Sequence, residues 1–188
     1  MRARLPLLAF LVVVPALAAL AACGDALGLP APHLVNVVDT VSLYALDGTP
    51  LETPSAFQLD GRRRIRTDQT AVFDFAFNLD SAKHALILST GALHLGQASG
   101  LQRSTTPFDR ITEAPTGGWD FTTGLVVDTG TVALVRSRLA LCSFGITVPF
   151  YAKLRVIAVD TVARRIDLQM LVDENCGYRG LAPGLPKL

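Results

Sequence analysis

The sequence has little cysteine and almost no net charge, and each of these shortages excludes a class of protein. Its 188 residues include only three cysteines, too few for a small domain built mainly on disulfides. Lys and Arg number 17 against 16 Asp and Glu, and half of the residues are hydrophobic. This balance excludes a disordered chain and a histone-like binder of nucleic acid. The length predicts one domain, or one domain with a tail.

The one long run without charge, Leu5–Leu20, is too short for a permanent transmembrane helix. Its length of about 16 residues gives roughly 24 Å of helix, short of the ~30 Å hydrocarbon core of a bilayer. Pro6 and Pro15 also interrupt it. Because Arg2 and Arg4 precede the run and small residues follow it, the N-terminus is typical of a secretory signal.

The end of this signal, Leu20-Ala21-Ala22-Cys23, resembles the lipobox of bacterial lipoproteins. The resemblance covers residues 1–23 only. It implies that residues 1–22 are a signal peptide that is removed, that Cys23 carries acyl chains, and that the bilayer is a partner. Gly24 after the cysteine implies sorting to the outer membrane, facing the periplasm or the cell surface. The alternatives are an ordinary secretory signal with an incidental cysteine, and an uncleaved anchor.

Acylation at Cys23 would fix the chain to a bilayer without a spanning segment. Each buried methylene contributes about 0.8 kcal/mol, so two or three acyl chains hold stably where one does not. Residues 23–34 then form the lipidated cysteine and a tether rich in Gly and Pro. About ten extended residues reach about 35 Å, so we expect the domain, residues 35–188, to work close to the membrane.

Lipidation of Cys23 would leave two thiols, Cys142 and Cys176. An exported chain meets an oxidising compartment, where an even number of cysteines predicts disulfides. The bridge would close a loop of about 35 residues, for which chain entropy gives roughly 3 to 4 kcal/mol. The alternative is a reactive thiol or a metal pair, but no Cys or His lies near either residue at zinc-like spacing.

Alternation of apolar and polar residues dominates the rest of the chain and predicts strands. The clearest case is 73–79, where Phe73, Phe75, Phe77 and Leu79 alternate with Asp74, Ala76 and Asn78. The same pattern predicts an antiparallel hairpin over 151–172. Further strands are predicted at 35–46, 56–59, 62–66, 84–89, 92–95, 125–128 and 131–141. Short strands separated by glycine turns indicate an all-β fold, an antiparallel β-sandwich or, as the alternative, a small β-barrel.

Residues 96–124 are the exception, because they are rich in Gly, Ser, Thr and Pro and are predicted to be irregular. Long loops in compact domains are often functional. Trp119 and Phe121 could line a binding site there, but such a pair more often closes the end of a core.

No set of residues for catalysis or for a metal ion is recognisable in the sequence. His33, His84 and His94 are candidate ligands or bases, and His84 and His94 could approach one another across the turn at Thr90-Gly91. That stretch, however, holds no Cys or carboxylate at ligand spacing. Asp74 is expected on the wetter face of its strand. We therefore predict neither a cofactor nor an enzyme.

A cluster of arginines gives the one candidate for an anion site. If 62–66 is a strand, Arg62, Arg64 and Arg66 project on one side, where guanidinium groups could hold phosphate or carboxylate. The alternative is a charged edge strand that prevents aggregation between sheet edges.

Together these features predict a lipid-anchored envelope protein with a non-catalytic binding or structural domain. Its partner would be an envelope protein or the cell wall, and not nucleic acid. One alternative is a carrier of a hydrophobic ligand, with the sheet curved round an apolar cavity, which requires a large dry pocket. The other is a hydrolase whose residues meet only in three dimensions.

Overall fold

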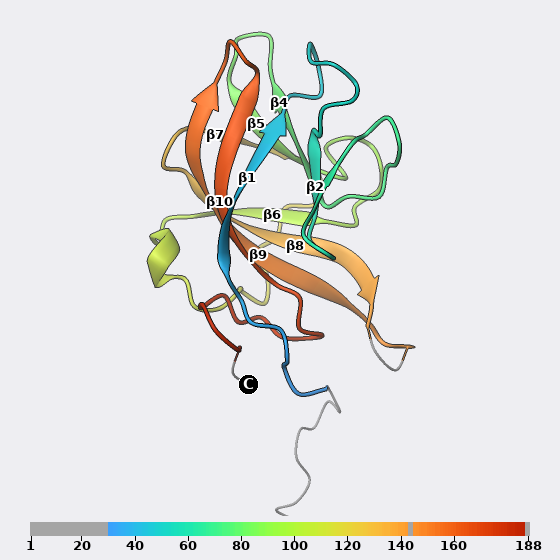
Figure 1. Ribbon diagram of the computed structural model, residues 1–188, viewed down its shortest axis with the longest axis vertical. Coiled ribbons are helices and arrows are strands. Elements are labelled where there is room, and N and C mark those ends of the chain that lie inside the picture. The colour runs from blue at the N-terminus through green and yellow to red at the C-terminus, as the bar shows by residue number, and fades with distance from the viewer. Residues whose placement is uncertain (1–29, 143–144, 187–188) are drawn as a thin grey trace, which may run out of the picture. The chain divides into compact units, whose positions relative to one another are not determined.

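Two antiparallel sheets make up the fold of the compact unit Pro32–Leu188. The computed structural model describes residues 30–142 and 145–186, and in this part each sheet has five strands (Figure 1). The long sheet has the order β1 (Val38–Tyr44), β10 (Arg165–Asp173), β9 (Thr147–Asp160), β8 (Val132–Leu141) and β6 (Gly100–Ser104). The short sheet has the order β3 (Arg63–Ile65), β2 (Ala56–Gln58), β4 (Phe75–Leu79), β5 (Ala85–Ser89) and β7 (Gly124–Val127). The predicted all-β sandwich is confirmed, since the two sheets remain separate.

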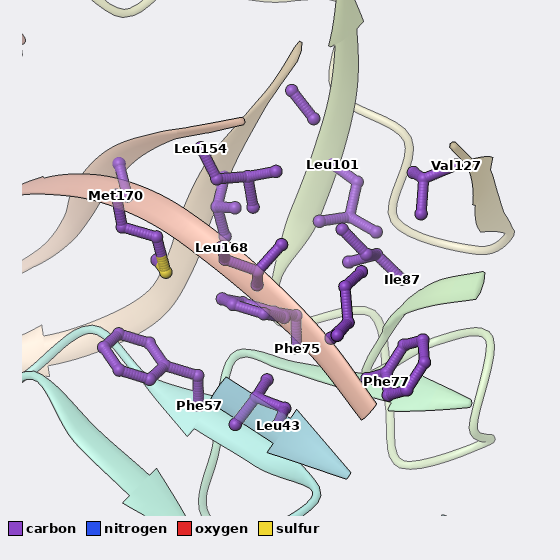
Figure 2. Packing of buried hydrophobic residues seen from close by; sticks show 14 of the residues in the cluster. Leu43, Phe57, Phe75, Phe77, Ile87, Leu101, Val127, Leu154, Leu168 and Met170 are labelled. Atoms are coloured by element: carbon purple, nitrogen blue, oxygen red, sulfur yellow. The ribbon is translucent and has the colours of Figure 1, made fainter. Parts of the chain in front are cut away.

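The space between the sheets is filled with apolar side chains, as Figure 2 shows. Phe57 and Phe75 of the short sheet lie with their ring centroids 5.7 Å apart. They pack in one cluster with Leu154, Leu168 and Met170 of the long sheet, each at most 2% exposed. Burying a side chain of this kind contributes about 1.5–3 kcal/mol, so this layer is the main source of stability.

A second apolar layer covers the outer face of the long sheet. The segment between β6 and β7, with the short helix η1 (Phe108–Arg110), lies against the C-terminal residues. Ala114 donates its N–H to the carbonyl of Arg179, and Leu181 donates to Thr112, each at 2.8 Å. The outer cluster formed in this way comprises Phe108, Ile111, Ala114, Leu134, Leu171 and Leu181.

Most of the predicted strands are confirmed within a few residues, and the hairpin 151–172 corresponds to β9 and β10. Residues 92–95 are an exception. They form turns in place of the predicted strand, and His94 has a φ of 59° in the left-handed region. The irregular segment 96–124 was also predicted wrongly in part, because it contains β6. β6 pairs with β8, a distant partner that local alternation does not reveal.

The predicted disulfide between Cys142 and Cys176 is confirmed. Their Cα atoms lie 5.9 Å apart. Cys142 follows the last residue of β8, and Cys176 lies three residues beyond the end of β10. Because β9 lies between these strands, the bridge joins two strands that are not neighbours in the sheet.

The prediction that Asp74 lies on the wetter face is wrong. Phe73 packs with Ala56 and Ala76 on the outer side of the short sheet, so the alternation breaks before β4 and Asp74 is only 1% exposed. Its carboxylate accepts the backbone N–H of Leu59 at 2.7 Å and that of Arg138, in β8, at 3.0 Å. Asp74 therefore links the two sheets, and burial raises the pKa of its carboxyl group.

Candidate binding groove

The structure does not place Arg62, Arg64 and Arg66 side by side on one face of a strand, as was expected. Arg62 precedes β3 in a turn, with a φ of 49°, and its Nε lies 2.7 Å from a carboxylate oxygen of Glu174. Arg66 follows β3 and forms an ion pair of 2.7 Å with Asp68. Because β3 spans only three residues, the assumed alternation across Arg62, Arg64 and Arg66 does not hold. Of the three, Arg64 alone lies within the strand and is exposed.

The other candidate residues give no metal site in the described part of the chain. Cys23 lies outside the described residues. His84 forms an exposed ion pair with Asp80, with 2.8 Å between Nδ1 and Oδ2. His33 donates its backbone N–H to Asn175 at 2.9 Å. In the described chain, no three or more His, Cys, Asp or Glu residues are grouped so that they could hold a metal ion.

An open hollow lies beside β6, at the edge of the long sheet. The first half of this edge is covered, because Leu101 and Asp120 exchange backbone hydrogen bonds of 2.8 and 2.9 Å. The second half faces residues 105–116. Between them is an open groove of about 580 Å³. We call it the β6 groove; its lining residues are Gln102, Arg103, Ser104, Thr105, Thr106, Arg110, Ile111, Thr112, Glu113, Ala114, Pro115, Thr116, Leu134 and Arg179.

The floor of the β6 groove belongs to the outer cluster, and a buried lysine holds it in place. Lys153 of β9 is 2% exposed, and its Nζ donates to the carbonyls of Phe108 and Ile111, both at 2.9 Å. The same nitrogen lies 4.5 Å from the centroid of the Phe108 ring. The pKa of the Lys153 amine is lowered from its ordinary value, because desolvation outweighs the opposing effect of the nearby Asp109 charge. The lysine thus fixes η1, and with it one wall of the groove, to the sheet.

The walls favour a ligand that is both anionic and rich in oxygen. Three arginines and one carboxylate line the groove, so the charge there is positive, and Arg179 pairs with the carboxylate of Glu113. Arg103 of β6 donates a hydrogen bond to the carbonyl of Val126 in β7, and so links the edges of the two sheets. Arg110 is exposed on the rim. Serine and threonine hydroxyls supply further hydrogen-bonding groups; they belong to Ser104, Thr105, Thr106, Thr112 and Thr116.

Two smaller hollows extend this surface along β6. One of about 450 Å³ lies between residues 103–108 and residues 130–132, with Arg155 on its wall. The other, of about 180 Å³, lies beside Asp120 and Thr123. Arg103 lines all three. A chain-like ligand could therefore follow the edge of the sheet past Arg103.

Sequence reasoning missed the groove because its arginines are scattered along the chain. Arg103 and Arg110 lie in the segment predicted to be irregular, whose composition was the one available signal. Arg179 comes from the C-terminal segment, and nothing in the sequence places it opposite residues 110–114. Lys153 occupies an outward position in a strand, where a lysine is ordinarily expected to reach solvent.

Chemically, the groove is suited to binding. In the described part of the chain, neither histidine nor cysteine lines it. The Ser104 hydroxyl donates to the carbonyl of Thr106 at 3.2 Å. No family model, curated protein or solved structure matched this chain in the comparisons.

Proposed function

We propose that this protein is a bacterial envelope lipoprotein, anchored through acylated Cys23, whose β-sandwich binds an acidic oligosaccharide without catalysis. The β6 groove supports the binding part of this proposal, because it combines an excess of positive charge with many hydroxyl groups. Guanidinium groups recognise carboxylates, and serine and threonine hydroxyls exchange hydrogen bonds with sugar hydroxyls. The resemblance of residues 20–23 to a lipobox supports the anchor. Cell-wall and surface polymers are ligands of this class.

The filled interior favours a ligand bound on the surface over a hydrophobic ligand carried between the sheets. Phe57, Phe75 and Phe77 occupy the layer that such a carrier would keep open (Figure 2). In residues 30–142 and 145–186 no helix is long and apolar enough to cross a membrane.

Loss of Arg110 and Arg179 from the β6 groove is expected to weaken binding of an acidic oligosaccharide. We expect the Arg110→Gln, Arg179→Gln double variant to bind a galacturonate oligomer at least about tenfold more weakly, since a hydrogen bond to a charged group contributes ~1.5–3 kcal/mol. Titration calorimetry measures this change.

The matched control is the Arg63→Gln, Arg64→Gln double variant, which removes the same charge from exposed positions on β3. It should bind as the unaltered protein does. Equal losses in the two double variants would indicate attraction by overall charge, and would contradict a site in the β6 groove.

A further inference from the structure

Exposed apolar side chains gather at one end of the sandwich. Three of them belong to the β8–β9 hairpin: Leu139 is 58% exposed, Leu141 75% and Ile146 38%. Three others belong to the first and last described residues of the compact unit: Leu34 is 39% exposed, Val35 54% and Leu185 53%. We call these six residues the apolar end.

Bonds within the compact unit hold these segments together. Asn175 donates to the carbonyl of Leu34 at 2.8 Å and accepts its N–H at 2.9 Å. The next residue, Cys176, is bonded to Cys142, which directly follows Leu141. Asn36 and Gly184 exchange backbone hydrogen bonds of 2.8 and 3.0 Å beside Leu185. Figure 1 shows the chain entering the sandwich at the same end as this hairpin.

The turn beside this end carries more basic than acidic side chains, namely Arg62, Arg63 and Arg64 against Asp60 and Glu174. The turn between β2 and β3 is held beside the end of β10, because Arg62 pairs with Glu174 and Gly61 donates its N–H to Glu174 at 2.7 Å. Arg63 and Arg64 follow this turn and are exposed. An apolar tip flanked by arginines is complementary to an anionic bilayer, whose headgroups attract cations and whose acyl region accepts apolar side chains.

From this arrangement we infer that the apolar end contacts the surface of the bilayer, with Leu139, Leu141 and Ile146 inserted between the headgroups. The inference rests on the proposed anchor, since Cys23 lies only nine positions before Pro32. Nine extended residues span at most about 32 Å, which keeps this end of the sandwich near the membrane. The turn between β9 and β10 then faces away, because β10 is nine residues long and spans about 30 Å.

Depth-dependent fluorescence quenching tests this orientation. Trp119 is the only tryptophan, so a Trp119→Phe background gives a single reporter after Leu141→Trp. The matched control is Val162→Trp, at a position 92% exposed in the turn between β9 and β10. Each protein, lipidated and extracted from membranes, is placed in vesicles of anionic lipid with brominated or ordinary acyl chains.

Tryptophan at position 141 should shift to shorter wavelength and be quenched by brominated chains, while tryptophan at position 162 should show neither change. If the protein co-floats with the vesicles but its tryptophan at position 141 is not quenched, the inference is overturned. The proposed anchor is unaffected by that result. Equal quenching at both positions would also overturn the inference.

A second arm separates this inference from the proposed anchor. A chain starting at Cys23 contains the whole compact unit with its core, and its only free thiol is Cys23, because Cys142 and Cys176 are bonded to each other. Coupling Cys23 to a maleimide lipid attaches this chain whether or not cells acylate it. Quenching at position 141 in the coupled protein supports the inference even if the extracted protein lacks acyl groups. Its absence in the coupled protein counts against the inference.

Discussion

Replacement of Cys142 and Cys176 by serine is expected to lower the free energy of unfolding by about 2–5 kcal/mol. The bridge spans 34 positions and joins the ends of β8 and β10 across β9. Without it, the unfolded chain gains conformations and the C-terminal segment is held only by its packing and hydrogen bonds. Denaturant unfolding under non-reducing conditions measures the loss.

Reduction provides the control for this prediction. A reductant should destabilise the unaltered protein by a similar amount and leave the double serine variant unchanged. A double variant as stable as the unaltered protein would show that packing of residues 174–186 alone secures the end of the sheet.

Asp74→Ala is expected to lower the free energy of unfolding by about 2–4 kcal/mol, because it leaves the buried N–H groups of Leu59 and Arg138 without an acceptor. Leu59 directly follows β2 of the short sheet and Arg138 belongs to β8 of the long sheet, so the loss falls on the junction between the two sheets. Asp39→Ala is the control, since Asp39 is exposed on β1. If both variants unfold at the same denaturant concentration as the unaltered protein, Asp74 does not link the sheets energetically.

The effect of Asp74 should also depend on pH. Burial raises the pKa of its carboxyl group above the unfolded value. The folded state therefore holds this proton more tightly than the unfolded state, and its contribution to stability falls as pH rises through the folded pKa. The stability difference between the unaltered protein and Asp74→Ala should be larger near pH 4 than near pH 8. A difference that grows with pH would mean that hydrogen bonds outweigh desolvation.

Alternation predicted most of the strands, including β1, whose partner β10 is distant in the sequence, but it missed β6. The hairpin of β9 and β10 is local, so the pattern over 151–172 was sufficient. β6 is short and pairs with β8 about thirty residues later, and its composition resembles that of a loop. The disulfide was predicted by counting thiols, because the expected export of the chain and the expected lipidation of Cys23 left two cysteines to pair.

The position of Asp74 shows the limit of the same reasoning. Phe73 and Phe75 have the spacing of one face, yet they pack on opposite sides of the short sheet. Asp74 is buried because its carboxylate accepts the N–H groups of Leu59 and Arg138, and the sequence alone does not place these two residues beside it. The β6 groove could not be predicted for the same reason, since Arg103, Arg110 and Arg179 are brought together only by the packing of the outer cluster.

The central claim, that a lipid anchor at Cys23 holds this sandwich at the membrane, is tested most directly by the intact mass of the protein extracted from bacterial membranes. We predict a chain that begins at Cys23, with the mass of residues 23–188 increased by a diacylglyceryl group, and by a further acyl chain where the amine is modified. A chain that begins at any other residue, or an unmodified Cys23, would contradict the account.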